Sequence, residues 1–275
     1  MGDSLSSWLA LREPADFAAR STALTQAVAD GLSADRPLCV LDLATGTGSN
    51  VRYLARRLPE PQHWLVVDRD PVLLEELPAR MSAWAGGRDV AVDTRRVDLG
   101  ALADADIFSR RHLVTASALL DLVSETWLRA LADRCRASGA AALFALTYNG
   151  QSSCIPVEPE DDAIRELMNR HQKTDKGLGG TAAGPGAAAC AARCFAEAGY
   201  HIRREASDWV LPPDARELQR QLIEGWAEAA AQISPEQSTV IDDWLRRRLA
   251  HVEHGFSRVI VGHVDLAAWL PHAGR

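Results

Sequence analysis

The chain has 275 residues, a length that suits one large α/β domain or a domain with an appended subdomain. Hydrophobic residues make up 47%, enough for a sizeable core, yet no apolar run is long enough to cross a bilayer. The net charge is −7 with both signs interspersed, which speaks against a nucleic-acid ligand, because such binding usually needs a basic surplus. Five cysteines without Cys-x-x-Cys spacing, and an acidic start unlike a secretory signal, predict a cytoplasmic protein with reduced thiols.

The first half of the chain alternates between two kinds of segment. Phe17, Leu24, Ala27 and Val28 mark one amphipathic helix ahead of everything else. Short apolar runs rich in Val, Leu and Ala then alternate with longer stretches of helical spacing. These runs lie at 38–43, 64–67, 89–92, 112–118 and 140–147. Continuous apolar strands between helices indicate a parallel sheet that is covered on both faces, a doubly wound α/β fold.

After residue 150 the pattern changes to longer helices and two further strands. In chain order we expect a helix, a glycine-rich loop with a new helix, a strand, two amphipathic helices and a closing strand, at 159–171, 171–195, 199–211, 213–231, 235–253 and 256–269. No repeat or low-complexity linker interrupts the chain, so the sequence predicts a single domain over residues 1–275. Its parts would be an N-terminal helical cap, a cofactor-binding core and a substrate-side lid with inserted helices, at 1–35, 36–150 and 151–275.

The stretch LCVLDLATGTGSN, residues 38–50, runs from an apolar strand into a glycine turn. Gly46 and Gly48 let the backbone turn tightly and approach a ligand at the start of the next helix. A dinucleotide fingerprint would need a third glycine where Val51 stands, so the spacing alone leaves the ligand open.

Acidic residues at the ends of three successive strands narrow the choice. Asp42, Asp68 and Asp98 would meet at one edge of a parallel sheet, where a carboxylate can accept hydrogen bonds from ribose hydroxyls or an adenine amino group. Each aspartate, taken alone, is equally well explained as a cap of the helix that follows. Three acids at these spacings favour a nucleoside ligand.

Together, VLDLATGTGSN, LVVDRDPVLL, VDLGAL and LVTASALLDLVS resemble the class I S-adenosylmethionine-dependent methyltransferases. The resemblance covers about residues 36–150, with a looser match in the closing strands. It implies a Rossmann-like, mostly parallel sheet of seven strands with the last strand antiparallel, an N-terminal helix and a helical insertion between the last two strands. It also implies S-adenosyl-L-methionine as cofactor and S-adenosyl-L-homocysteine as product.

The resemblance carries cofactor roles onto individual residues. The loop from Ala44 to Gly48 would pass beneath the methionine part of the donor, with Asp42 orienting the loop or meeting the ammonium group. Asp68 would hold the ribose, and Asp98 with the Leu99 backbone would hold the adenine. The segment around Ala116 and Ser117 would touch the donor near its amino-acid end. The full predicted set is Arg20, Asp42, Ala44, Thr45, Gly46, Gly48, Asn50, Asp68, Arg69, Asp98, Leu99, Ala116 and Ser117.

Ala44 departs from the family pattern, since most members carry glycine at this position. If the position needs a positive φ, alanine costs about 1 kcal/mol, and if the backbone is extended there, the methyl group is harmless. A nicotinamide dinucleotide is the alternative cofactor, although its enzymes would more naturally show the third glycine.

The methyl acceptor is less well specified. The segment after the fourth strand lacks the Asn/Asp-Pro-Pro-aromatic motif of enzymes that methylate base amino groups. Candidate catalytic residues are His171, Tyr148 and Asp121, and candidate substrate contacts are Asn149, Asp175, Lys176 and Trp226. Competing interpretations are helix capping for Asp121, a turn at Asn149-Gly150 and a structural role for His171.

The sequence therefore predicts methyl transfer to a small-molecule metabolite in a partly enclosed pocket, with no nucleic-acid or membrane partner. The N-terminal helix, with Arg12, Glu13 and Asp16, is a candidate second cover of that pocket. His251 and His254 lack a third ligand, so we expect no metal site. Two alternatives are a methyltransferase acting on a protein or tRNA, and a donor-binding regulator without catalysis. Oligomeric state and the methylated atom stay open.

Overall fold

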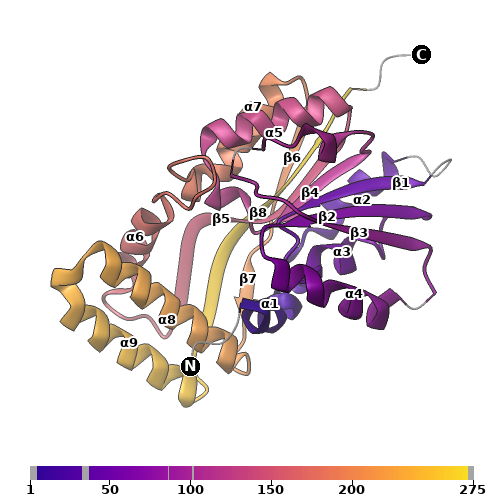
Figure 1. Cartoon of the computed structure of the whole chain (residues 1–275). Coiled ribbons are helices and arrows are strands. Elements are labelled where there is room, and N and C mark those ends of the chain that lie inside the picture. Colours follow the sequence, from indigo (N-terminus) through magenta and orange to yellow (C-terminus); the bar gives the residue numbers. More distant parts are fainter. Residues whose placement is uncertain (1–4, 33–36, 86, 101, 272–275) are drawn as a thin grey trace.

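A computed structural model describes residues 5–32, 37–85, 87–100 and 102–271 (Figure 1). Within these residues, one eight-stranded sheet has the order β3-β2-β1-β4-β5-β8-β6, and the short β7 pairs beside β8. The strands are β1 Leu38–Leu43, β2 Gln62–Asp68, β3 Val90–Arg96, β4 Leu113–Ser117, β5 Ala141–Ile155, β6 His201–Ala206, β7 Trp209–Leu211 and β8 Arg258–Trp269. Neighbours from β3 to β5 pair in parallel, and β8 pairs antiparallel with β5, β6 and β7. The predicted mostly parallel sheet with an antiparallel last strand is confirmed, with β7 as an addition.

Helices cover both faces of the sheet. They are α1 Leu5–Ala19, α2 Thr22–Asp30, α3 Ser49–Leu54, α4 Pro71–Ala85, α5 Glu125–Ser138, α6 Asp161–Gln172, α7 Ala187–Glu197, α8 Arg216–Ile233 and α9 Ser238–Glu253. Alternate strand residues face opposite ways. Val40 and Trp64 pack with α2, α3 and α4, whereas Leu41 and Leu65 pack with α5 and α7. None of the helices in the described ranges is both long and apolar enough to span a membrane.

The N-terminal segment forms two helices where one was expected. The break lies at Arg20 and Ser21, because the Ser21 side chain caps α2 by accepting a hydrogen bond from the Leu24 amide at 3.1 Å. The Ser21 amide in turn donates to Asp265 of β8 at 2.9 Å. The junction of α1 and α2 is therefore joined to the last strand at this break.

β5 is twice as long as its apolar run suggested, since it continues past 147 to Ile155. Its pairing with β8 shifts register between Tyr148 and Ser152, so the predicted Asn149-Gly150 turn is a bulge within the strand. Gly150 has a φ of 89°, and the Asn149 side chain occupies the space beside Gly262 that a Cβ would fill. The bulge lets β5 and β8 extend together beyond the rest of the sheet (Figure 1).

The strand expected over 199–211 is divided into β6 and β7 at Ser207 and Asp208. Both strands keep one continuous register against β8. At the division, the Asp208 carboxylate accepts from the His263 amide at 3.0 Å, while the Ser207 amide donates to the His263 carbonyl at 3.0 Å. A side chain replaces one backbone acceptor of the ladder, which is why the strand is interrupted there.

The predicted helical insertion between the last strands consists of α8 and α9. With α6 they pack against the extended parts of β5, β7 and β8 and form a core of their own, well separated in Figure 1 from α3 and α4. Trp244 and Arg248 of α9 are fully buried there. The Arg248 guanidinium donates to both carboxylate oxygens of Asp161 and to the Pro156 carbonyl, and Trp244 Nε1 donates to Asp161 at 2.8 Å.

We predict that Arg248→Met lowers the free energy of unfolding by about 3–5 kcal/mol, because it leaves the Asp161 carboxylate without its buried partner. The exposed Arg246, which pairs with Asp243 on the same helix, provides the matched control. Arg246→Met should change stability by less than about 0.5 kcal/mol. Urea unfolding measures both, and equal effects of the two substitutions would contradict the structural role given to Arg248.

Candidate functional site

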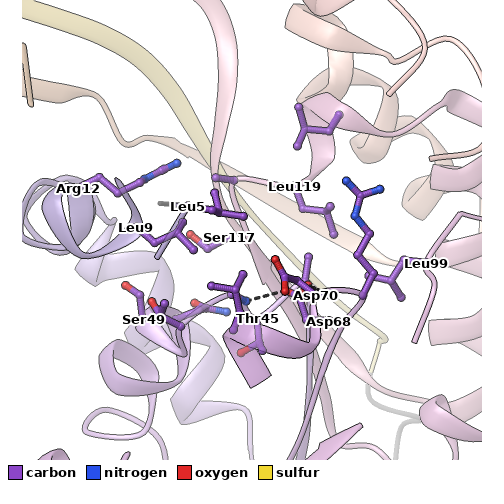
Figure 2. A pocket seen from close by; sticks show the side chains of 18 of the residues that line it. Leu5, Leu9, Arg12, Thr45, Ser49, Asp68, Asp70, Leu99, Ser117 and Leu119 are labelled. Carbon is purple, nitrogen blue, oxygen red and sulfur yellow. Dashed lines mark hydrogen bonds between the residues drawn. The ribbon is translucent and has the colours of Figure 1, made fainter. Parts of the chain in front are cut away.

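A cavity of about 310 Å³ opens at the carboxyl ends of the central strands. It lies where the strand order reverses direction between β1 and β4, the usual ligand position in open α/β sheets. Its walls come from α1, the loop after β1, and the segments that follow β2, β3 and β4. In Figure 2, Leu5, Leu9 and Arg12 of α1 lie across from Asp68, Asp70 and Leu99, with Thr45 between the two groups.

The loop after β1 forms the floor of this cavity. Ala44, Thr45 and Gly46 line it, and Gly48 precedes α3, which begins at Ser49 as the glycine turn predicted. Ala44 has a φ of 51°, so the position does need the left-handed conformation that costs alanine about 1 kcal/mol. The Thr47 hydroxyl is buried in the wall without a hydrogen-bond partner among the described residues. A polar ligand in the cavity would satisfy it.

Asp68 ends β2 and holds the loop in place. Its Oδ2 accepts from the Gly46 amide at 2.8 Å, and its Oδ1 accepts from the Asp70 amide at 3.0 Å. The side chain is 8% exposed and lines the cavity. Each carboxylate oxygen has a second lone pair, so both remain able to accept from a ligand hydroxyl.

A buried polar network lies directly behind the loop. Asn50 lines the cavity, and its Nδ2 donates to Asp42 at 2.6 Å and to Thr115 at 3.1 Å. Arg20 Nη1 donates to Asn50 at 2.7 Å, and its Nε lies 3.8 Å from Asp265. Arg20 and Asp42 thus act behind the wall, not at its surface. Burial raises the pKa of Asp42 to about 6.

The opposite end of the cavity is where an adenine was expected. Leu99 and Arg69 line this end, and the Leu99 carbonyl accepts from Trp127 Nε1 at 2.6 Å. Asp98 lies in an adjoining open hollow shared with Arg69 and Arg96. Of the segment after β4, Ser117 lines the cavity, whereas Ala116 is buried in the sheet core.

Asp121 lies next to the cavity wall in a short 3₁₀ helix, Leu120–Leu122, whose last residue lines the cavity. Burial raises the pKa of Asp121 to about 6, opposed by backbone hydrogen bonds and by the charges of Arg12 and Lys176. The carboxylate is therefore ionised at neutral pH and able to accept a proton.

The other predicted acceptor-side residues lie outside the cavity wall. Tyr148 donates to Asn169 at 2.9 Å, and burial raises its pKa. His171 contacts Gln232 of α8 at 3.0 Å and Lys176 at 3.5 Å. Asn149 lies in the β5 bulge, Asp175 caps its own loop by accepting from the Gly177 amide at 2.7 Å, and Trp226 is buried in the α8 core. Of the thirteen predicted cofactor residues, eight line the cavity, and these six acceptor-side residues, Lys176 included, do not.

Arg12 and Asp16 of α1 line the cavity and were expected as part of a second cover, but several other lining residues are absent from the sequence-based set. Leu5 and Leu9 come from α1, and Asp70 comes from the turn after β2. Others are Thr47, Ser49, Leu73, Ala118, Leu119, Leu122 and Leu178. In the sequence, Asp70-Pro71 is typical of the start of a helix, so Asp70 was not included among the candidate site residues.

Leu178 reaches the cavity from the glycine-rich loop. The Ser124 amide donates to the Leu178 carbonyl at 3.2 Å, and the Ala183 amide donates to the Val123 carbonyl at 2.8 Å. Within the described part of the chain, these bonds fasten the loop beside the start of α5.

A second polar group of side chains lies behind Arg12. The Arg12 guanidinium stacks over Trp209 at 4.8 Å and pairs with Asp16 at 3.0 Å, and Trp209 Nε1 donates to Asp16 at 3.1 Å. The His263 ring lies 5.3 Å from that of Trp209 and 6.3 Å from that of Tyr148. Burial lowers the pKa of His263 to about 3, so this ring is neutral at physiological pH.

No family model and no curated protein matches the chain. Solved structures do match in fold. The cyclopropane synthase MmaA2 from Mycobacterium tuberculosis has a TM-score of 0.48 at 11% identity, over 96% of this chain and 94% of that one. A Haemonchus contortus phosphoethanolamine N-methyltransferase 2 in complex with S-adenosylhomocysteine has a TM-score of 0.47 at 14% identity, over 98% and 59%. A precorrin-6y C5,15-methyltransferase from Geobacter metallireducens has a TM-score of 0.44 at 10% identity, over 90% and 87%. These likenesses concern the fold.

We predict that Ala44→Gly raises the free energy of unfolding by up to about 1 kcal/mol. Glycine relieves the positive-φ strain, which outweighs its larger unfolded-state entropy. Ala192→Gly, in the interior of α7, should instead lower stability by about 0.5–1 kcal/mol. Thermal unfolding measures both, and a destabilised Ala44→Gly protein would mean that the loop tolerates alanine without strain.

We predict that the stability of Asp42→Asn relative to the natural protein depends on pH. A carboxyl whose pKa rises on folding from 3.8 to about 6 loses about 3 kcal/mol of stability as pH rises through that window. Asparagine cannot ionise, so the variant should gain on the natural protein between pH 4 and pH 6, with the difference constant above that. Denaturant titrations at pH 4, 5, 6 and 7 give the difference, and a flat profile would show that Asp42 folds without a raised pKa.

Proposed function

We propose that the protein is an S-adenosylmethionine-dependent methyltransferase that acts on a small-molecule metabolite. The observation that carries this is the cavity at the carboxyl ends of β1 to β4, floored by the glycine loop and bordered by Asp68 and Leu99. A nucleoside in such a cavity meets a carboxylate for its ribose and apolar walls for its base. The sequence motifs point to the same residues, which makes this the best-supported function.

The chain's own residues have distinct roles in this proposal. Asp68 accepts from the ribose hydroxyls, with Asp70 beside it as a second acceptor, and Leu73 and Leu99 pack against the base. Asn50 and Thr47 provide polar contacts toward the amino-acid end. Bound there, S-adenosylmethionine supplies an electrophilic methyl group, and alignment of the acceptor with that group provides much of the rate.

Asp121 is the proposed proton acceptor for an acceptor hydroxyl or amine. Its pKa of about 6 suits a base at neutral pH, and its helix adjoins the cavity wall at Leu122. Arg12 and Asp16 line the same side and form a polar boundary for the acceptor. His171, Tyr148, Asn149, Asp175, Lys176 and Trp226 would contribute only by forming the outer part of an acceptor path.

The cavity size favours a second candidate, a donor-binding protein without catalysis. About 310 Å³ lies at the lower end of the roughly 300–1,000 Å³ typical of small-molecule sites, so a bound donor leaves little room for an acceptor. Formation of S-adenosylhomocysteine from S-adenosylmethionine in the presence of a metabolite extract distinguishes the two. Acceptor-dependent product supports the enzyme, and tight donor binding without any product supports the regulator.

We predict that Asp68→Ala weakens S-adenosylmethionine binding about tenfold or more, since hydrogen bonds to a charged group are worth about 1.5–3 kcal/mol each. Asp93→Ala is the control, because Asp93 lies on the exposed edge strand β3 and pairs with His63 at 2.7 Å, away from the cavity. Isothermal titration gives both affinities, and circular dichroism checks that the variants are folded.

The same titration is run with NAD on the natural protein. Binding of NAD alone would overturn the proposed function, and unchanged S-adenosylmethionine affinity in folded Asp68→Ala protein would overturn the ribose assignment. Asp68→Asn, which keeps one acceptor oxygen for the Gly46 amide, should fall between the other two proteins.

A further inference from the structure

Arg52 of α3 joins two elements that line the cavity without lining it itself. Its Nε and Nη2 donate to the two carboxylate oxygens of Glu13 in α1, at 2.8 and 2.5 Å. Its Nη1 donates to the Thr47 carbonyl of the glycine loop at 2.6 Å. The two side chains are 8% and 20% exposed, so this forked pair is largely withdrawn from water, where charged hydrogen bonds are strongest.

The Thr47 carbonyl belongs to the most constrained part of the loop. It lies between Gly46 and Gly48, whose φ angles are 55° and 79°. A Cβ on Gly48 would lie 3.3 Å from Arg52 Nη1, so the guanidinium sits directly against the turn. The peptide between Thr47 and Gly48 is held at both ends, because its Thr47 carbonyl accepts from Arg52 and its Gly48 amide donates to the Thr45 carbonyl at 2.9 Å.

α1 contacts both the cavity and the core beneath α8, and Trp8 and Leu11 before Pro14 lie against that core as Ala15 and Ala19 do after it. Beyond Pro14, Ala15 and Ala19 pack on the α8 core and Phe17 packs on Tyr53, with ring centroids 5.4 Å apart. The half before it covers the cavity with Leu5 and Leu9, and Leu9 lies 3.0 Å from a Cβ position on Gly46.

Polar contacts add to this packing in the part of α1 before Pro14. Ser6 donates to Glu76 of α4 at 2.5 Å, and Glu13 pairs with Arg52. Pro14 has no amide hydrogen to donate to the Ala10 carbonyl, which weakens the helix just where Glu13 is bound.

We infer that Arg52 is a positioning residue that couples the docking of α1 to the ligand-ready shape of the glycine loop. When α1 is docked, Glu13 holds the guanidinium that directs the Thr47 carbonyl, and when the loop is ordered by a ligand, Arg52 is held where Glu13 binds. Coupling of this kind is reciprocal, so the ligand should stabilise α1 as strongly as α1 stabilises ligand binding. For the identity of the ligand alone, this inference rests on the proposed function.

The test combines S-adenosylhomocysteine titration with amide hydrogen exchange of residues 5–12. In the natural protein, the ligand should slow exchange of these amides. Arg52→Met should weaken binding about tenfold, within the 5–150-fold range typical of coupled sites, and should abolish the ligand's effect on α1 exchange. Glu13→Gln should weaken binding less, and the two substitutions combined should weaken it by less than the product of their separate effects.

Arg88→Met is the control, since Arg88 forms a more exposed ion pair with Glu60, at 2.8 Å, just before β2. It should leave affinity and α1 exchange unchanged. Arg52→Lys, which keeps the charge and loses the fork, should shift both quantities in the same direction as Arg52→Met and serves if the latter does not fold.

If Arg52→Met or Arg52→Lys protein binds S-adenosylhomocysteine as tightly as the natural protein, the proposed coupling is wrong. A weakened affinity with ligand protection of α1 intact would also contradict it, because Arg52 would then support the loop alone. If the natural protein binds no S-adenosyl compound, the proposed function fails. The coupling between α1 and the glycine loop is then tested by hydrogen exchange in the absence of ligand. Glu13→Gln must then still speed exchange of the glycine-loop amides 45–48, and unchanged exchange there would overturn it.

Discussion

The buried pairing of Arg20 with Asp265 is the interaction on which the ligand-binding half of the molecule depends. Asp265 accepts hydrogen bonds from two backbone amides, that of Ser21 between α1 and α2 and that of Leu146 in β5. Arg20 also donates a hydrogen bond to Asn50, which links Asp265 to the cavity wall. The Asp265 carboxylate thus fixes the junction of α1 and α2, strand β8 and the glycine loop relative to one another. Burial lowers the pKa of Arg20, whose Nε and Nη2 have no hydrogen-bond partner among the described residues, and the charge of Asp265 is the main effect that opposes this cost.

The glycine loop and the acid beside it could be predicted from sequence because their signals are local. A strand followed at once by Gly46 and Gly48, and an acid at the end of the next strand, specify a loop and its partner within a few residues of each. Position 44 is instructive, since the sequence posed the alternative between a left-handed and an extended backbone, and the φ of 51° decides for the strained one.

The positions of the residues proposed for the acceptor side could not be predicted in the same way, because these positions depend on contacts distant in sequence. The extension of β5 requires the Asn149 side chain to fit against Gly262, more than 100 residues later, and this extension carries α6 and His171 away from the cavity. The sequence predicted the N-terminal helix as a second cover of the pocket, but not its individual contacts. Those appear only in the structure, where Glu13 pairs with Arg52 and Leu9 lies against Gly46.

The described residues divide into three hydrophobic clusters, and this division has a consequence for how the molecule opens and varies. Two clusters lie on opposite faces of the same central strands and must form together. The third lies beneath α6, α8 and α9, and α1 packs against it through Trp8, Leu11, Ala15 and Ala19. Loosening of this cluster would therefore act on the cavity through α1. Amino-acid substitutions in the part beneath α6, α8 and α9 would then change the approach to the cavity without changing the residues of the loop that forms its floor. One part of the molecule would stay constant while the other varies.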